Sequence, residues 1–241
     1  MSIAKKIAIL IFVQISITFN IHVYSLSYKN LIDRTNLMDR SVSSIVKDKD
    51  GFVWIASRSG ISKYDGRNIK HYNLSASEII LDRDGREVSI HKAPDGKLWA
   101  FTDSGRIFYY DAQSDSFMLF TDIGITSDPT LIKDLIVDPK GFIWVATING
   151  LQKFDSRSPD QKPLKTNNDL SINCIVPFSD TTLALGTANG LYFVDVHSGH
   201  KTGSRLYNQH NIMSLYKDDS RKYLWIGSFS SGLFVWDFEN Q

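Results

Sequence analysis

Two acidic turn sequences and one histidine pair are the first residues in this chain whose types and spacing could do chemistry. Asp48–Gly51 and Asp82–Gly85 both read Asp-x-Asp-Gly, which opens calcium-binding loops, and His197 and His200 have a spacing that can grip a metal ion. The acidic sequences lack the later ligands and the final glutamate, and no third ligand lies near the histidines in the sequence. We therefore expect solvated hairpin turns at these places, with no metal and no cofactor.

Sequence motifs of catalysis are missing too. The chain has no Gly-x-Ser-x-Gly turn, no glycine-rich phosphate-binding loop and no His-Glu-x-x-His pair. A lyase would need a histidine or tyrosine beside a cation, and His91 and His210 are candidates only by default. We predict that this chain is not itself an enzyme.

Polar residues at predicted turns are better candidates, and their chemistry is ligand binding. Their amide, carboxylate and guanidinium groups can form hydrogen bonds with a polar ligand, and an arginine can pair with an anionic group. The competing interpretation is that they are ordinary hydrophilic turn residues. The candidates are Arg40, Arg58, Asp103, Asn149 and Asn189.

These turns belong to a unit that recurs five times, with steps of 45, 45, 40 and 41 residues between its anchor positions. The anchor is a tryptophan, replaced by Ala184 in the fourth copy, and a glycine follows six or seven residues later. Each copy then closes with an apolar or aromatic residue and an aspartate. The repeat anchors are Trp54, Trp99, Trp144, Trp225, Gly60, Gly105, Gly150, Gly190 and Gly232.

The first copy predicts a four-stranded antiparallel sheet, with extended runs at 43–47, 52–57, 61–64 and 69–72 separated by turn sequences. The tryptophan runs are apolar on both faces, so each sheet must be covered on both sides, as in radially stacked blades. We predict an all-β fold, a β-propeller of four-stranded antiparallel blades, with about five blades and an incomplete ring. The blades are expected at about 41–73, 87–120, 131–157, 171–198 and 211–241, with the tryptophans in the core between blades rather than in a sugar-stacking platform.

The amino-terminal residues have a different character. Two lysines precede an apolar run at 7–19, and small or tolerated residues follow, so residues 1–25 are predicted to be a secretory signal peptide, with 26–40 as a lead-in segment. The formal charge is +1 without a basic stripe, which argues against nucleic acid as a partner. Cys174 is the single cysteine, and its apolar neighbours predict an inert buried thiol.

The run 41–57, followed by 60–66, resembles the regulator-propeller repeat found in the periplasmic sensor regions of hybrid two-component histidine kinases of gut Bacteroidetes. The resemblance covers roughly residues 28–241 and is weakest in the fourth copy. It departs from the usual pattern at 37–39, where Leu-Met-Asp stands in place of a Gly-Leu-Ser type stretch.

The resemblance implies a periplasmic ligand-sensing domain whose parent protein sits in the inner membrane. Its implied partners are an oligosaccharide released from a polysaccharide and the remainder of the sensor kinase, and open terminal blades favour self-association as a homodimer. We expect the amino-terminal fragment of a sensor, or the product of an interrupted gene, that can bind but not phosphorylate. A secreted propeller enzyme, such as a carbohydrate lyase or hydrolase, and a periplasmic protein-binding scaffold remain alternatives.

Blade topology predicts which edge binds the ligand. In a four-stranded antiparallel blade, the segments between blades share an edge with the turns after the tryptophan strands. Length variation collects in the between-blade stretches 73–87, 121–131, 157–170 and 199–211, whereas the opposite hairpin turns are tight. We therefore expect the ligand at the edge that carries the candidate turn residues.

Overall fold

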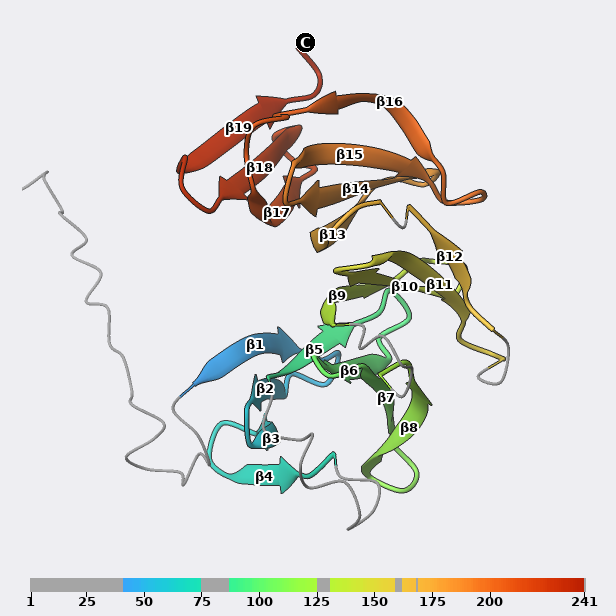
Figure 1. Cartoon of the computed structure of the whole chain (residues 1–241). Coiled ribbons are helices and arrows are strands. Elements are labelled where there is room, and N and C mark those ends of the chain that lie inside the picture. Colours follow the sequence, from blue (N-terminus) through green and yellow to red (C-terminus); the bar gives the residue numbers. More distant parts are fainter. Residues whose placement is uncertain (1–40, 75–86, 125–130, 159–161, 168, 241) are drawn as a thin grey trace, which may run out of the picture. The chain divides into compact units, whose positions relative to one another are not determined.

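The computed structural model describes residues 41–74, 87–124, 131–158, 162–167 and 169–240, and these residues form five antiparallel sheets in chain order (Figure 1). Four sheets have four strands and the last has three. Within each sheet, strands that follow one another in the sequence are hydrogen-bonded neighbours. This confirms the predicted all-β propeller of antiparallel blades, while the predicted incomplete ring stays a prediction.

The strands of the five blades follow one pattern. The first blade has β1 (Val42–Lys47), β2 (Val53–Ser57), β3 (Gly60–Tyr64) and β4 (Ile69–Tyr72). The second has β5 (Val88–Lys92), β6 (Leu98–Thr102), β7 (Arg106–Asp111) and β8 (Ser116–Asp122). The third has β9 (Ile132–Val137), β10 (Phe142–Thr147), β11 (Gly150–Asp155) and β12 (Leu164–Thr166). The fourth has β13 (Ile172–Ser179), β14 (Thr182–Thr187), β15 (Gly190–Asp195) and β16 (Lys201–Leu206), and the fifth has β17 (Ile212–Asp218), β18 (Tyr223–Ser228) and β19 (Leu233–Asp237).

The turn between the second and third strands explains the repeated glycine. Gly60 has φ +121°, and a Cβ there would lie 2.7 Å from the carbonyl oxygen of Tyr72, so a larger residue would be strained and crowded. A hydroxyl closes the same turn, because the Thr147 Oγ1 donates to the Gly150 carbonyl at 2.8 Å and Thr187 repeats this bond with Gly190. The glycine anchors therefore act through the backbone.

The core lies between neighbouring blades, and the tryptophans are part of it. Trp54 packs with buried residues of the second blade, Trp99 with those of the third and Trp144 with those of the fourth. All three are almost fully buried, which confirms the core interpretation for them. The same interpretation is wrong for Trp225, which is only half-buried, because no described blade covers its side of β18.

Two between-blade stretches are shorter than expected. The fourth strand of the third blade, β12, lies inside the expected loop 157–170, and β16 lies inside 199–211. Both strands are largely exposed and polar, so they lack the apolar pattern by which the inner strands can be found in the sequence.

The described residues belong to one compact unit of the chain, 35–241. The predicted signal peptide at 1–25 and lead-in segment at 26–40 lie outside the described residues. Within the described ranges, no helix has the length and apolar character that crossing a membrane requires.

Candidate functional site

One edge of the blades, here called the entry face, consists of the segments entering each blade and the turns between second and third strands. Backbone N–H groups in these turns donate to the entering segments: Ile148 to the carbonyl of Leu131 at 3.3 Å, and Ala188 to that of Ser171 at 3.0 Å. Asp103 and Phe229 donate in the same way to Glu87 and Asn211. The entering segments and these turns therefore share an edge, as blade topology predicts.

Four of the predicted binding residues lie on this entry face, one in the turn between the second and third strands of each of the first four blades. Arg58, Asn149 and Asn189 are exposed, and Asp103 is half-buried. The backbone N–H groups of Asn149 and Asn189 donate to Thr147 and Thr187 at 3.1 Å, so both residues have a structural part in their turns. None of these four residues lines a described cavity, and Arg40 lies outside the described residues.

A buried ion pair on the entry face escaped the sequence analysis. The Arg106 Nε donates to Asp122 Oδ2 at 3.3 Å, and both side chains are at least nine-tenths buried. The signal was visible: the residue after the repeat glycine is isoleucine or leucine in the other four copies and arginine only here. Asp122 also accepts the backbone N–H of Gly124, so the pair fixes the exit of the second blade.

The opposite edge, here called the hairpin face, consists of the turns between first and second and between third and fourth strands. It contains a cavity of about 560 Å³ formed by turns of the third, fourth and fifth blades, here called the hairpin-face cavity. That volume lies in the range of small-molecule sites. Its lining residues are Asp138, Pro139, Lys140, Pro177, Phe178, Ser179, Asp180, Leu183, Val196, Lys217 and Asp219.

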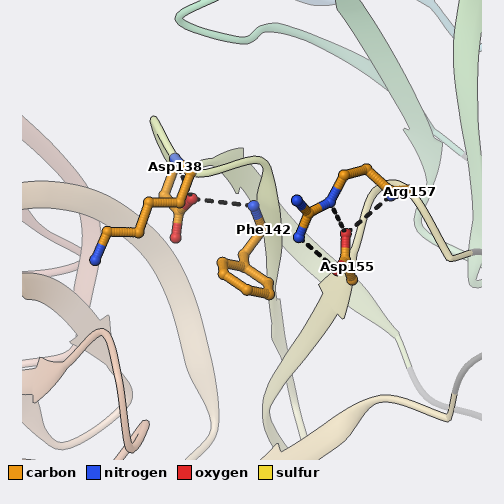
Figure 2. A network of polar contacts seen from close by, with 5 residues as sticks. Asp138, Phe142, Asp155 and Arg157 are labelled. Carbon is orange, nitrogen blue, oxygen red and sulfur yellow. Dashed lines mark hydrogen bonds and ion pairs between the residues drawn. The ribbon is translucent and has the colours of Figure 1, made fainter.

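Asp138 organises the part of this cavity that the third blade contributes (Figure 2). Its Oδ1 accepts the backbone N–H groups of Lys140 at 2.9 Å and Phe142 at 3.0 Å. Its Oδ2 accepts the indole N–H of Trp144 at 3.0 Å. Asp48 makes the same three kinds of bond in the first blade, including 2.7 Å to Trp54. This aspartate lies six residues before the tryptophan in both copies, a signal that the sequence analysis did not use.

A second group in Figure 2 lies where the third blade turns toward its fourth strand. The Arg157 guanidinium donates two hydrogen bonds to Asp155, from Nε to Oδ1 at 2.8 Å and from a terminal nitrogen to Oδ2 at 2.7 Å. This contact lowers the pKa of Asp155 to about 2. Arg157 and Asp138 both line a smaller cavity of about 280 Å³ between the second and third blades.

The far wall of the hairpin-face cavity is aromatic and cationic. Phe178 is half-buried and stacks on Trp236, with centroids 5.6 Å apart and planes at 4°. The Lys217 Nζ lies 5.7 Å from the Phe178 ring centroid and pairs with Asp219 at 2.5 Å. The cavity therefore combines an aromatic ring and prolines with carboxylates, a hydroxyl and ammonium groups.

Asp134 is a titratable group at the contact between the third and fourth blades. Its carboxylate accepts the N–H of Leu135 at 2.8 Å and that of Ile175, in the next blade, at 3.0 Å. Burial raises the pKa of Asp134 to about 6, and the nearby Cys174 thiol, itself buried, has its pKa raised to about 12. The thiol is buried as the sequence predicts.

The raised pKa of Asp134 predicts a loss of stability with rising pH. Between pH 4 and 6 the folded chain keeps a proton that the unfolded chain releases, so the free energy of unfolding falls by about 1–3 kcal/mol over that window. His91, whose pKa burial lowers to about 4, gives the opposite slope, so the readout is the difference between wild type and Asp134→Asn in urea unfolding. The free energy of unfolding of the variant should lack the decrease with pH that Asp134 causes. Parallel pH profiles of wild type and variant would contradict this assignment.

No cluster of three or more histidine, cysteine, aspartate or glutamate side chains suited to a metal ion occurs among the residues that the structure places.

The comparisons with known proteins place the repeat in a family. The two-component regulator propeller model matches residues 36–59, so the chain carries a repeat of that family, as the sequence resemblance indicates. No curated protein is found to match the chain.

Solved structures share the fold. One is described as the extracellular domain of the hybrid two-component system BT3049 from B. thetaiotaomicron, with 20% identity, a TM-score of 0.68, and coverage of 87% of this chain and 30% of that chain. Another is the extracellular domain of BT4673 from the same organism, with 23% identity, a TM-score of 0.60, and coverage of 81% and 26%. The designed Ika8 protein matches with 13% identity and a TM-score of 0.58, over 81% of this chain and 58% of that chain. This chain thus spans less than a third of the length of the two bacterial domains.

Proposed function

We propose that this chain is the extracytoplasmic ligand-sensing propeller of a hybrid two-component sensor kinase, and that it recognises an oligosaccharide released from a polysaccharide. The observation that carries the proposal is the regulator-propeller repeat at 36–59 within a β-propeller fold. The fold that it shares with the extracellular domain of a hybrid two-component system supports the same role. The chain's part is to bind, and phosphoryl transfer belongs to the remainder of the sensor.

The hairpin-face cavity supports the choice of an oligosaccharide. A pyranose ring offers a C–H face to Phe178 and the neighbouring prolines, and it offers hydroxyls to Asp180, Ser179 and the Lys140 ammonium group. Lys140 and Lys217 add positive charge suited to a uronate or sulfate substituent. We place the ligand in this cavity because it combines an aromatic ring with hydrogen-bonding and charged groups. The sequence-predicted entry-face residues Arg58, Asp103, Asn149 and Asn189 form the second proposed site.

A thermal-unfolding screen of the purified chain against defined neutral, uronate-containing and sulfated oligosaccharides tests this function. A ligand at about 100 times its dissociation constant should stabilise the folded chain by about 2.7 kcal/mol. Lys140→Ala and Asp180→Ala should weaken binding without altering the unbound melting temperature, whereas the matched entry-face variants Arg58→Ala and Asn149→Ala should bind normally. A well-folded sample that no glycan stabilises would count against the sensory role, and the reverse pattern of variants would move the site to the entry face.

Export is the second part of the proposal. Cleavage after Ser25 by a signal peptidase would release the mature chain into the periplasm, in line with the extracellular placement of the structural neighbours. Amino-terminal sequencing of the periplasmic protein checks it, and a mature chain that still begins at Met1 would contradict it.

A further inference from the structure

The second blade lacks a carboxylate that the first and third blades have. Asp48 and Asp138 each accept the indole N–H of the tryptophan six residues later, at 2.7 and 3.0 Å. Ala93 holds the equivalent position in the second blade, because its backbone N–H donates to the carbonyl of the residue four positions later, as those of Asp48 and Asp138 do. The alanine therefore removes an acceptor at a place where two other copies of the repeat have one.

The donor that this acceptor would serve is still present. Trp99 lies six residues after Ala93 and is 1% exposed, and no hydrogen bond of its indole nitrogen occurs among the residues that the structure describes. Donors in such places are usually paired, and an unpaired one costs free energy. Ala93 and Trp99 both line the cavity of about 280 Å³ between the second and third blades, here called the smaller cavity. A ligand acceptor atom in the smaller cavity can therefore restore the bond that the other two blades make.

A guanidinium group is held at the same cavity. Arg157 lines it, and three hydrogen bonds to Asp155 fix the arginine, two from the side chain and one from the backbone N–H at 3.0 Å. Figure 2 shows the guanidinium directed toward the turn that holds Asp138 and Phe142. Within the described ranges its second terminal nitrogen makes no hydrogen bond, and the side chain is 70% exposed. The arginine can therefore donate to a ligand without giving up Asp155.

The other charged groups of the smaller cavity also suit an anion. The Lys97 ammonium group lies 5.1 Å from the ring centroid of Trp99, so it adds positive charge beside the indole. The two carboxylates in the lining already accept hydrogen bonds from the chain. Asp95 accepts the backbone N–H of Lys97 at 2.9 Å, and Asp138 accepts two N–H groups of its own turn and the indole of Trp144. Two cations and one indole donor thus remain for a ligand oxygen.

We infer that the smaller cavity binds the carboxylate of a uronate unit, which takes the place of the aspartate missing at Ala93. The indole N–H of Trp99 and the Arg157 guanidinium are its donors. The smaller cavity and the hairpin-face cavity share Asp138 and Pro139, so a ligand of two or more sugar units can occupy both. The sugar part of this inference rests on the proposed function, whereas the acceptor site rests on Ala93 and Trp99.

Ala93→Asp tests the acceptor site without a ligand, because it restores the carboxylate of the first and third blades. In heteronuclear NMR spectra of the full chain, the indole N–H signal of Trp99, assigned by its loss in Trp99→Phe, should shift. Its exchange with water should slow at least about tenfold, since a hydrogen bond now protects it. An unchanged signal and exchange rate in the folded variant would overturn the inference, because the indole would then not face the place of the missing carboxylate.

The binding test uses disaccharides to tetrasaccharides of galacturonate and of glucuronate, and the same molecules with their carboxyl groups reduced to alcohols. In thermal unfolding the acidic compounds should stabilise the wild type, and the reduced ones should bind at least about tenfold more weakly. Arg157→Ala removes a cation, and Ala93→Asp fills the cavity with a negative charge. Each should weaken binding of the acidic compounds at least about tenfold.

Arg67→Ala is the matched control and should bind like the wild type. Arg67 is exposed and lies two residues after Asp65, as Arg157 does after Asp155, but in the first blade and away from the smaller cavity. Equal binding of acidic and reduced compounds, or unchanged binding by both test variants, would overturn this inference and leave the proposed function standing. If no oligosaccharide, neutral or acidic, stabilised the chain, both would be overturned.

Discussion

Replacing Trp144 by alanine is expected to lower the free energy of unfolding by about 3–5 kcal/mol, the usual loss for a large aromatic side chain removed from a packed core. The side chain is fully buried between the third and fourth blades, packed with Ile136, Leu185 and their neighbours. The loss of the indole N–H would also leave the Oδ2 atom of Asp138 without its donor. Urea unfolding monitored by circular dichroism measures the change.

Trp225→Ala is the matched control, since Trp225 holds the same repeat position in the fifth blade but is only half-buried. Its loss should be about 1 kcal/mol. Equal losses at the two positions would show that the interblade core does not extend as described, or that the fifth blade is covered in solution.

The second large effect is expected at Asp138. Removing its carboxylate in Asp138→Ala leaves two backbone N–H groups and one indole N–H without their acceptor, and each unsatisfied buried donor costs about 1–3 kcal/mol. Water at the turn can satisfy part of this loss, so we expect a destabilisation of about 2–4 kcal/mol in urea unfolding. Asp138→Asn keeps one acceptor oxygen and should fall between alanine and wild type.

Asp95→Ala provides the comparison at the equivalent turn of the second blade. Asp95 accepts one backbone N–H, that of Lys97 at 2.9 Å, at an exposed position, so its loss should stay below about 1 kcal/mol. If Asp138→Ala were no more destabilising than Asp95→Ala, the Asp138 network would have no special part in holding the hairpin and the indole.

The fold could be predicted because its signal repeats. Tryptophan, glycine and the closing aspartate recur at near-constant steps, so five weak patterns support one interpretation even where Ala184 replaces the tryptophan. The outer strands β12 and β16 were missed because neither has an apolar periodicity. β12 has only three residues, and the six residues of β16 are largely exposed. Exposure at the repeat ends was missed too, because a register position such as Trp225 says nothing about whether a neighbour covers it.

The candidate site was harder to predict than the fold. Loop lengths favour the entry face, yet a cavity of about 560 Å³ lies on the hairpin face. It forms where Asp138, Phe178 and Lys217 converge from three blades, at positions about 40 residues apart in the sequence, and no pattern within one copy reveals that convergence. Arg106 could have been predicted, since it departs from the isoleucine or leucine that the other copies have at its position. The Asp138–Trp144 pair could also have been predicted, since its spacing recurs in the first copy.

The lone cysteine gives this molecule a built-in chemical reporter of blade separation. Cys174 is buried with Ala184 and with Ile212 of the fifth blade, and burial raises its pKa to about 12, so hardly any reactive thiolate is present near neutral pH. An alkylating reagent can therefore modify it only after the fourth and fifth blades part. Labelling kinetics at this single atom would report how often that seam opens while the rest of the chain stays folded.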